Sequence, residues 1–211
     1  EEKERYQNLI QVSEDQVKAE QQAAAAARAR GGNQNYYKNA TASGVWRWPQ
    51  DRIPISYYVY PGDKVRGYKP EYDEILRKSF NEWADASDER VDFIRVYRPE
   101  EAHLTVTWTD DLHAPNLVAE AGHTTWESDE QGIKNAAIKL LTVSPFKGEL
   151  MTDYLMHNIC LHEIGHALGI GGHSNVQDDI MYPACFLQTG ISQADRNTLA
   201  LLYEGKAKGA D

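Results

Sequence analysis

The sequence is poor in cysteine, in positive charge and in long apolar runs. Its 211 residues include only two cysteines, Cys160 and Cys185, which are too few for a disulfide framework. Lysine and arginine number 22 against 32 aspartates and glutamates, so the net charge is −10. Nucleic acids and anionic membranes bind basic surfaces, so neither is expected as a partner. No apolar run approaches the roughly 18 residues that span a bilayer, so no membrane span is expected.

The N-terminal segment differs in composition from the rest of the chain. Residues 1–30 combine sparse apolar positions with Glu, Gln, Lys and five consecutive alanines, which predicts a helix without a core-facing stripe. Gly31 and the polar residues after it end that helix. We place a domain boundary near Gly44. Residues 1–44 are then a helical leader, a linker or a pro-segment, and residues 45–211 are the main domain.

The main domain alternates between strand-like and helix-like patterns. We expect strands over Ile53–Tyr60, Val91–Tyr97, Leu104–Trp108 and Asn135–Thr142, and helices over Pro70–Ala86, about Leu150–Leu168 and Gln193–Tyr203. Residues 112–135 are predicted to be irregular and acidic. Ser192 precedes the last helix and is a residue type that caps helix N-termini. No internal repeat is present, and the length suits one domain with an accessory segment.

Residues 162–173 read HEIGHALGIGGH and contain the candidate metal-binding and catalytic residues. On a helix, His162 and His166 lie about 40° apart around the axis and about 6 Å apart along it. Both imidazoles therefore reach one metal ion from the same face, and Glu163 lies beside it, able to take a proton from bound water. Zinc fits this arrangement, because it commonly binds three protein ligands and leaves a fourth position for water.

The pentapeptide alone also fits two surface histidines on an amphipathic helix, but the residues after it favour a metal site. Gly169 falls where a helix needs a left-handed end, and His173 follows the turn as a candidate third ligand. Asp179–Pro183 then supplies a methionine turn. Met181 is expected to form an apolar floor beneath the zinc, because a thioether is a poor ligand for this ion. Tyr182 is expected either to line the cleft or to pack internally.

With these motifs the sequence resembles the metzincins and, within them, the matrixins, the family of the matrix metalloproteinases. The resemblance covers roughly residues 45–205. It implies an α+β metzincin-type fold: a twisted, mostly parallel sheet with an antiparallel edge strand and three helices, to which the N-terminal helical extension is added. The resembling residues are His162-Glu163-x-x-His166-x-x-Gly169, His173-Ser174, Ile180-Met181-Tyr182-Pro183, and Ser192-Gln193-Ala194-Asp195 through Leu201-Leu202-Tyr203.

Three features depart from the matrixin pattern. His173 follows the second histidine by seven residues instead of six, and the pair Gly171-Gly172 is the easiest place to absorb the extra residue. The family's structural zinc site retains one match, His123, so a second Zn²⁺ is an alternative only. Acidic clusters such as Asp110-Asp111 are alternative sites for Ca²⁺, although most such clusters are simply solvated. No cysteine lies in residues 1–44, so a thiol switch of the matrixin pro-segment type is absent from this chain.

The resemblance implies a zinc-dependent endopeptidase. His162, His166 and His173 would hold the zinc, and Glu163 would activate the attacking water. One alternative is a different zincin whose third ligand is a downstream Glu, for which Glu204 is the candidate on the last helix. A second alternative is an inactive, zinc-stabilised module that binds peptides.

Protein or peptide substrates are expected to bind in an extended conformation along a rim at Glu120–Trp126. The wall of the main specificity pocket is expected at Pro183–Gly190. The protein is expected to be a monomer that is secreted, extracellular or periplasmic. The first residue is Glu and no signal peptide is visible, so we expect a processed product. Whether Cys160 and Cys185 form a bridge is left open.

Overall fold

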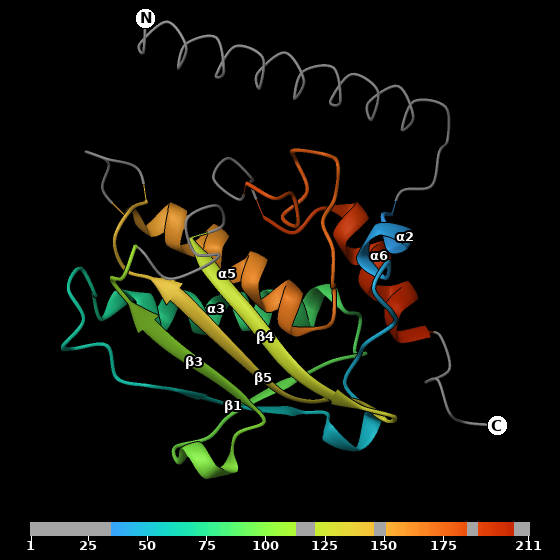
Figure 1. The fold of residues 1–211 in the computed structure, drawn as a ribbon, viewed down its shortest axis with the longest axis horizontal. Coiled ribbons are helices and arrows are strands. Elements are labelled where there is room, and N and C mark those ends of the chain that lie inside the picture. Colours follow the sequence, from blue (N-terminus) through green and yellow to red (C-terminus); the bar gives the residue numbers. More distant parts are fainter. Residues whose placement is uncertain (1–34, 113–120, 146–150, 185–189, 205–211) are drawn as a thin grey trace, which may run out of the picture.

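A computed structural model describes residues 35–112, 121–145, 151–184 and 190–204 of the chain. The helix predicted over residues 1–30 lies outside these ranges. Within them, one sheet and the helices packed against it surround a single apolar core (Figure 1).

The described strands form one mixed sheet in the order β2-β1-β3-β5-β4 (Figure 1). They are β1 (Ile55–Val59), β2 (Phe93–Arg95), β3 (Leu104–Thr109), β4 (Gly122–Asp129) and β5 (Gly132–Leu141). β1 pairs in parallel with β2 and β3, and β3 pairs in parallel with β5. β4 runs antiparallel to β5 at the edge. The mostly parallel sheet with an antiparallel edge strand is therefore confirmed.

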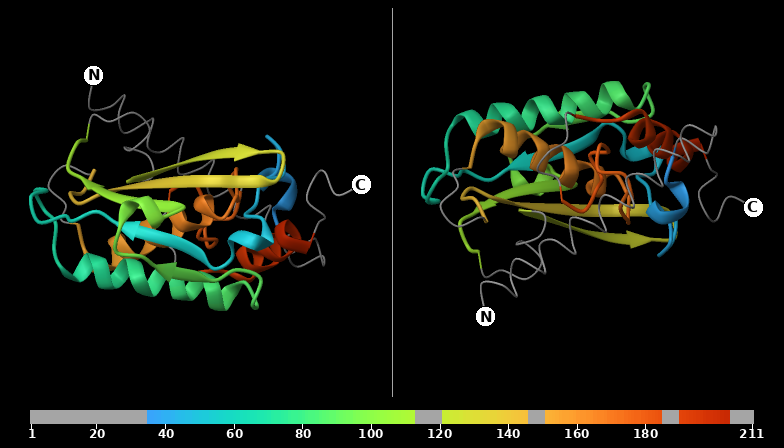
Figure 2. Two further views of the ribbon diagram at one scale, coloured as in Figure 1. Left: turned by 90° about the horizontal axis from the view of Figure 1, so that it is seen from below. Right: turned by 90° about the horizontal axis from the view of Figure 1, so that it is seen from above.

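Two long helices cover one face of this sheet (Figure 2). The described helices are α2 (Tyr37–Ala40), α3 (Glu71–Ala86), α5 (Asp153–Ala167) and α6 (Gln193–Glu204), with 3-10 turns η1 (Gln50–Arg52) and η2 (Pro99–Glu101). α3 buries Tyr72, Leu76, Phe80 and Trp83, the three-and-four spacing of an amphipathic helix. α5 is buried nearly all round from Met156 onward, because it lies between α3 and strands β4 and β5.

One sequence-based expectation is wrong. Residues 112–135 were expected to be irregular, but β4 occupies Gly122–Asp129 and β5 begins at Gly132. β4 carries polar side chains because it is an edge strand with much of its surface exposed, so it lacks the apolar alternation by which strands are recognised. Its main chain pairs with β5 regardless of those side chains. The other predicted elements are present with slightly different ends, and β2 is the most shortened.

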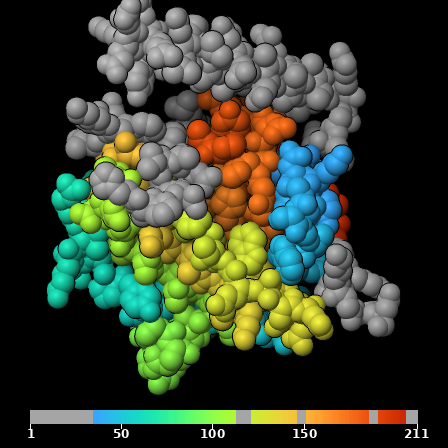
Figure 3. All heavy atoms as spheres, viewed as in Figure 1, coloured from blue at the N-terminus to red at the C-terminus, as the bar shows by residue number. Residues whose placement is uncertain are grey.

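The described residues before Val45 pack onto the main domain. Tyr36 and Ala40 are buried in the same apolar core as the sheet, and α2 lies against α6. In Figure 3 the blue atoms of this segment lie beside orange atoms from the region around residue 170. The division of the chain near Gly44 stays a prediction, but residues 36–44 share the core of the domain that follows them.

Candidate metal centre and catalytic cleft

Helix α5 carries the first two histidines of the motif and the glutamate between them. Its first turn is capped by Thr152, whose hydroxyl accepts the N–H of Leu155 at 3.1 Å. Its last turn ends at Gly169, which has a φ of 100°. A Cβ at Gly169 would lie 2.0 Å from the carbonyl oxygen of Trp46, so the tight turn after the helix requires glycine. The predicted left-handed end is confirmed.

The three histidines converge after this turn. One ligand atom from each of His162, His166 and His173 lies within 4.8 Å of the others. His162 and His166 are buried and His173 is partly buried. The ring centroids are 4.8 to 5.3 Å apart. The structure thus brings together the residues that the sequence predicted as metal ligands.

Hydrogen bonds orient two of these rings. His162 Nδ1 lies 2.7 Å from the carbonyl oxygen of Ile180, and His166 Nδ1 lies 2.6 Å from that of Ile170. A carbonyl can only accept, so both Nδ1 atoms carry hydrogen and a neutral ring has its lone pair on Nε2. The two Nε2 atoms are 3.2 Å apart. Two lone pairs that face each other at this distance repel unless a cation lies between them, so the donor set fits zinc.

Burial favours the neutral form of these rings. It lowers the pKa of His162 well below the usual histidine value, and the neighbouring His166 lowers that pKa further. A neutral imidazole is the form that binds a metal ion. The electrostatic environment therefore agrees with the hydrogen-bond pattern.

Glu163 points from α5 toward the edge strand β4. Its carboxylate Oε2 lies 2.6 Å from the hydroxyl of Thr124, which donates to it. A Cβ at Gly122 would lie 2.5 Å from Glu163 Cγ, so glycine leaves the space that this side chain fills. These roles of Thr124 and Gly122 were not predicted from the sequence. A strand prediction over this segment would have placed both residues on the same face of the strand.

The predicted methionine turn packs against α5. Met181 is fully buried, and a Cβ at Gly165 would lie 2.3 Å from its sulfur, so the side chain packs against the backbone of α5. Tyr182 is partly exposed and Pro183 is exposed. Cys185 and the other residues up to 189, which include most of the predicted specificity-pocket wall, lie outside the described residues.

Two buried carboxylates hold the loop that contains this turn. Asp195 Oδ2 accepts the N–H groups of Ile180 at 2.9 Å and Ser192 at 2.7 Å. Asp179 accepts the hydroxyls of Ser174 and Ser192. Burial raises the pKa of Asp195, and the hydrogen bond from Tyr36 partly offsets that effect. From the sequence Asp195 was predicted only as part of a motif; its hydrogen bonds to the loop around Ile180 come from the fold.

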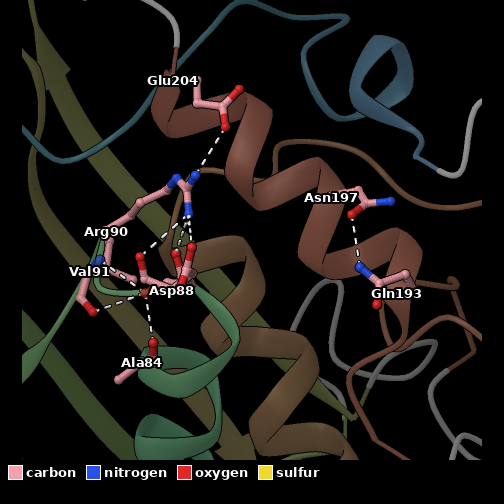
Figure 4. Close-up of polar contacts among 8 residues, drawn as sticks. Ala84, Asp88, Arg90, Val91, Gln193, Asn197 and Glu204 are labelled. Carbon is pink, nitrogen blue, oxygen red and sulfur yellow. Dashed lines mark hydrogen bonds and ion pairs between the residues drawn. The ribbon is translucent and has the colours of Figure 1, made fainter.

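The remaining candidates lie elsewhere. Glu204 ends α6, where it pairs with Arg90 at 3.0 Å (Figure 4). His123 is on β4 and belongs to no group of three or more possible ligand residues in the described ranges. Cys160 is buried in the core. A second Zn²⁺ or a Ca²⁺ ion stays a prediction without support. None of the described helices combines the length and apolarity that crossing a membrane requires.

Comparisons with known proteins agree with this geometry. The chain is similar to metalloendoproteinase 5-MMP of Arabidopsis thaliana, at 25% identity over 182 residues, which are 77% of this chain and 47% of that relative. It is also similar to metalloendoproteinase 4-MMP of the same plant, at 25% identity over 146 residues, 65% of this chain and 41% of that relative. The chain thus spans less than half the length of these curated relatives. The family model for matrixin matches residues 47–204, so the chain belongs to the matrixin family.

Proposed function

We propose that this chain is a zinc-dependent endopeptidase that cleaves proteins bound in an extended conformation. The observation that supports this most directly is the convergence of His162, His166 and His173 beside the buried carboxylate of Glu163. A purely structural zinc site uses a fourth protein ligand, whereas this site offers three histidines and a base. Membership of the matrixin family supports the same function.

The three histidines would hold the ion through their ring nitrogens. A zinc ion bound there supplies Lewis-acid chemistry, which polarises a scissile carbonyl and acidifies water. The Glu163 carboxylate accepts the proton of the attacking water and then delivers it to the leaving amide nitrogen. The Thr124 hydroxyl, which donates to this carboxylate, would fix its orientation.

The substrate would bind along β4. Among the described strands, β4 pairs only with β5, so the main-chain groups along its other edge have no described strand partner. An extended peptide can add to such an edge, where main-chain hydrogen bonds give affinity and neighbouring pockets select side chains. Gly122 and Thr124 place this edge directly beside Glu163. We further propose that the protein acts outside the cytoplasm and that it is a monomer.

Two other functions are less well supported. A zincin with Glu204 as third ligand requires a free carboxylate near the histidines, but Glu204 is paired with Arg90 at the end of α6. An inactive peptide-binding module does not require the Thr124–Glu163 hydrogen bond, which orients a carboxylate for proton transfer.

The test is hydrolysis of a quenched fluorescent peptide library by the full chain. We expect hydrolysis that a chelator abolishes and that one equivalent of Zn²⁺ restores. Metal analysis should find one zinc per chain. Stoichiometric zinc without hydrolysis of any library would favour the inactive module, and hydrolysis that survives complete removal of metal would refute the proposal.

A further inference from the structure

A segment just before the residues that match the matrixin family model contacts the loop that carries His173. We call residues 36–46 the strap. Its backbone N–H at Tyr36 donates to the hydroxyl of Thr198 at 3.0 Å, and its Tyr36 hydroxyl donates to Asp195 at 2.6 Å. Ala40 is fully buried. The strap is therefore anchored on α6 by two hydrogen bonds, and its helix α2 packs against α6.

The strap lies against the loop that carries the third histidine. The carbonyl oxygen of Ala40 accepts the N–H of Gly171 at 2.9 Å. A Cβ at Gly172 would lie 2.3 Å from the carbonyl oxygen of Asn39, so the two backbones approach as closely as they do because residue 172 is glycine. His173 follows directly. These two glycines are also the place where the extra residue between His166 and His173 is most easily absorbed, which would put that residue at the contact with the strap.

The strap reaches the opposite side of the site through a chain of hydrogen bonds. Tyr36 donates to Asp195, whose other oxygen accepts the N–H of Ile180 at 2.9 Å. The carbonyl of Ile180 in turn accepts the Nδ1–H of His162 at 2.7 Å. One short segment thus contacts the loop of one histidine and, through three hydrogen bonds, orients the ring of another.

We propose that the strap is a positioning element of the metal centre, with Tyr36 and Ala40 as the residues through which it acts. This inference rests on the metal-binding role proposed above. Groups that hydrogen-bond to metal ligands raise the affinity for the metal ion, because they fix the orientation of the ligands before the ion binds. The strap does this for a loop that contains two consecutive glycines and so loses much backbone freedom when it is ordered.

The test uses single substitutions in the full chain, with metal affinity as the readout. Gly172→Ala places a methyl group against Asn39 and should displace the strap from the loop. Tyr36→Phe removes only the hydroxyl. We expect Gly172→Ala to weaken Zn²⁺ affinity on the order of tenfold and Tyr36→Phe to weaken it several-fold. Both should shift the visible absorption bands of the Co²⁺-loaded protein, whereas the control Tyr37→Phe should not.

A double-mutant cycle then identifies the strap as the common cause. Residues that act separately have additive effects, whereas residues that act through one element do not. Once Gly172→Ala has displaced the strap, Tyr36→Phe should weaken Zn²⁺ binding little further. Additive losses, or unchanged affinity and unchanged Co²⁺ bands in both single variants, would overturn the inference. Denaturant unfolding of each metal-free variant separates general destabilisation from an effect on the site. A wild-type chain that fails to bind Zn²⁺ would instead refute the proposed function.

Discussion

The hydroxyl of Thr124 on the edge strand lies 2.6 Å from the carboxylate of Glu163 on the buried helix. This hydrogen bond joins the two walls of the proposed cleft. β4 would hold the substrate main chain, and α5 carries the base that would act on it. The distance between the substrate and the base would therefore be set by the packing of β4 against α5. This close packing is possible because residue 122 is glycine and leaves room for the Glu163 side chain.

Replacing the proposed base should abolish catalysis and spare metal binding. We expect Glu163→Gln to lower kcat by about 100- to 10,000-fold, because general acid–base catalysis contributes a factor of this size. The zinc content should stay at one per chain. Peptide hydrolysis and metal analysis on the same sample check both statements. The matched control is Glu127→Gln, an exposed carboxylate on β4. Equal turnover of Glu163→Gln and the wild type would rule out this mechanism.

Removing the hydroxyl that orients the base should have a smaller effect. Thr124→Val keeps the shape of the side chain and loses the donor, so we expect kcat to fall about tenfold, as loss of a hydrogen bond to a charged group implies. Thr124→Ser should restore most of the activity. KM should change less than kcat, because the hydroxyl acts on Glu163. Thr125→Val changes the neighbouring exposed residue and serves as the control. An equal loss in both valine variants would contradict the assigned role.

Replacing each of two glycines by alanine tests whether the turn after α5 requires glycine for steric reasons. Gly169 and Gly190 have φ values of 100° and 120°, so alanine is strained at both. Only at Gly169 would the new Cβ meet another atom closely, at 2.0 Å from the Trp46 carbonyl, whereas nothing lies within 4 Å at Gly190. Gly169→Ala should therefore lower the free energy of unfolding by more than Gly190→Ala, whose cost should be about 1–3 kcal/mol. Urea denaturation measures both, and equal losses would refute the close contact.

His103, which lies outside the proposed metal centre, should make the free energy of unfolding depend on pH. Burial lowers its pKa below the usual histidine value of 6.5, and the positive charge of Arg52 lowers that pKa further. The folded protein thus binds this proton less readily than the unfolded chain does. The contribution of His103 to stability is present above pH 6.5 and is lost as the pH falls through the folded-state pKa.

We therefore expect His103→Gln to lose less unfolding free energy than the wild type when both are acidified below pH 6.5. The three histidines of the proposed metal site are the same in both proteins, so at equal Zn²⁺ concentration their contribution cancels in the comparison. His157→Gln is the control, since that histidine lies beside Glu82, at 2.7 Å, instead of beside a positive charge. Parallel pH profiles for the wild type and His103→Gln would contradict the prediction.

The sequence alone predicted the candidate metal-binding residues and most of the helices and strands. His162, His166 and Gly169 are local features of one helix and its end, so their spacing fixes their geometry. Helices α3 and α6 were found because apolar residues recur at helical spacing where one face packs on a core.

Only the tertiary structure revealed what surrounds those residues. β4 was missed because an edge strand is specified by main-chain pairing with β5, not by its own apolar pattern. The contacts of Thr124 with Glu163 and of Tyr36 with Asp195 join residues 39 and 159 positions apart. No local pattern encodes such pairs, because they form only when separate elements pack together. The sequence thus determined which residues can hold a metal ion, and packing decided which others position them.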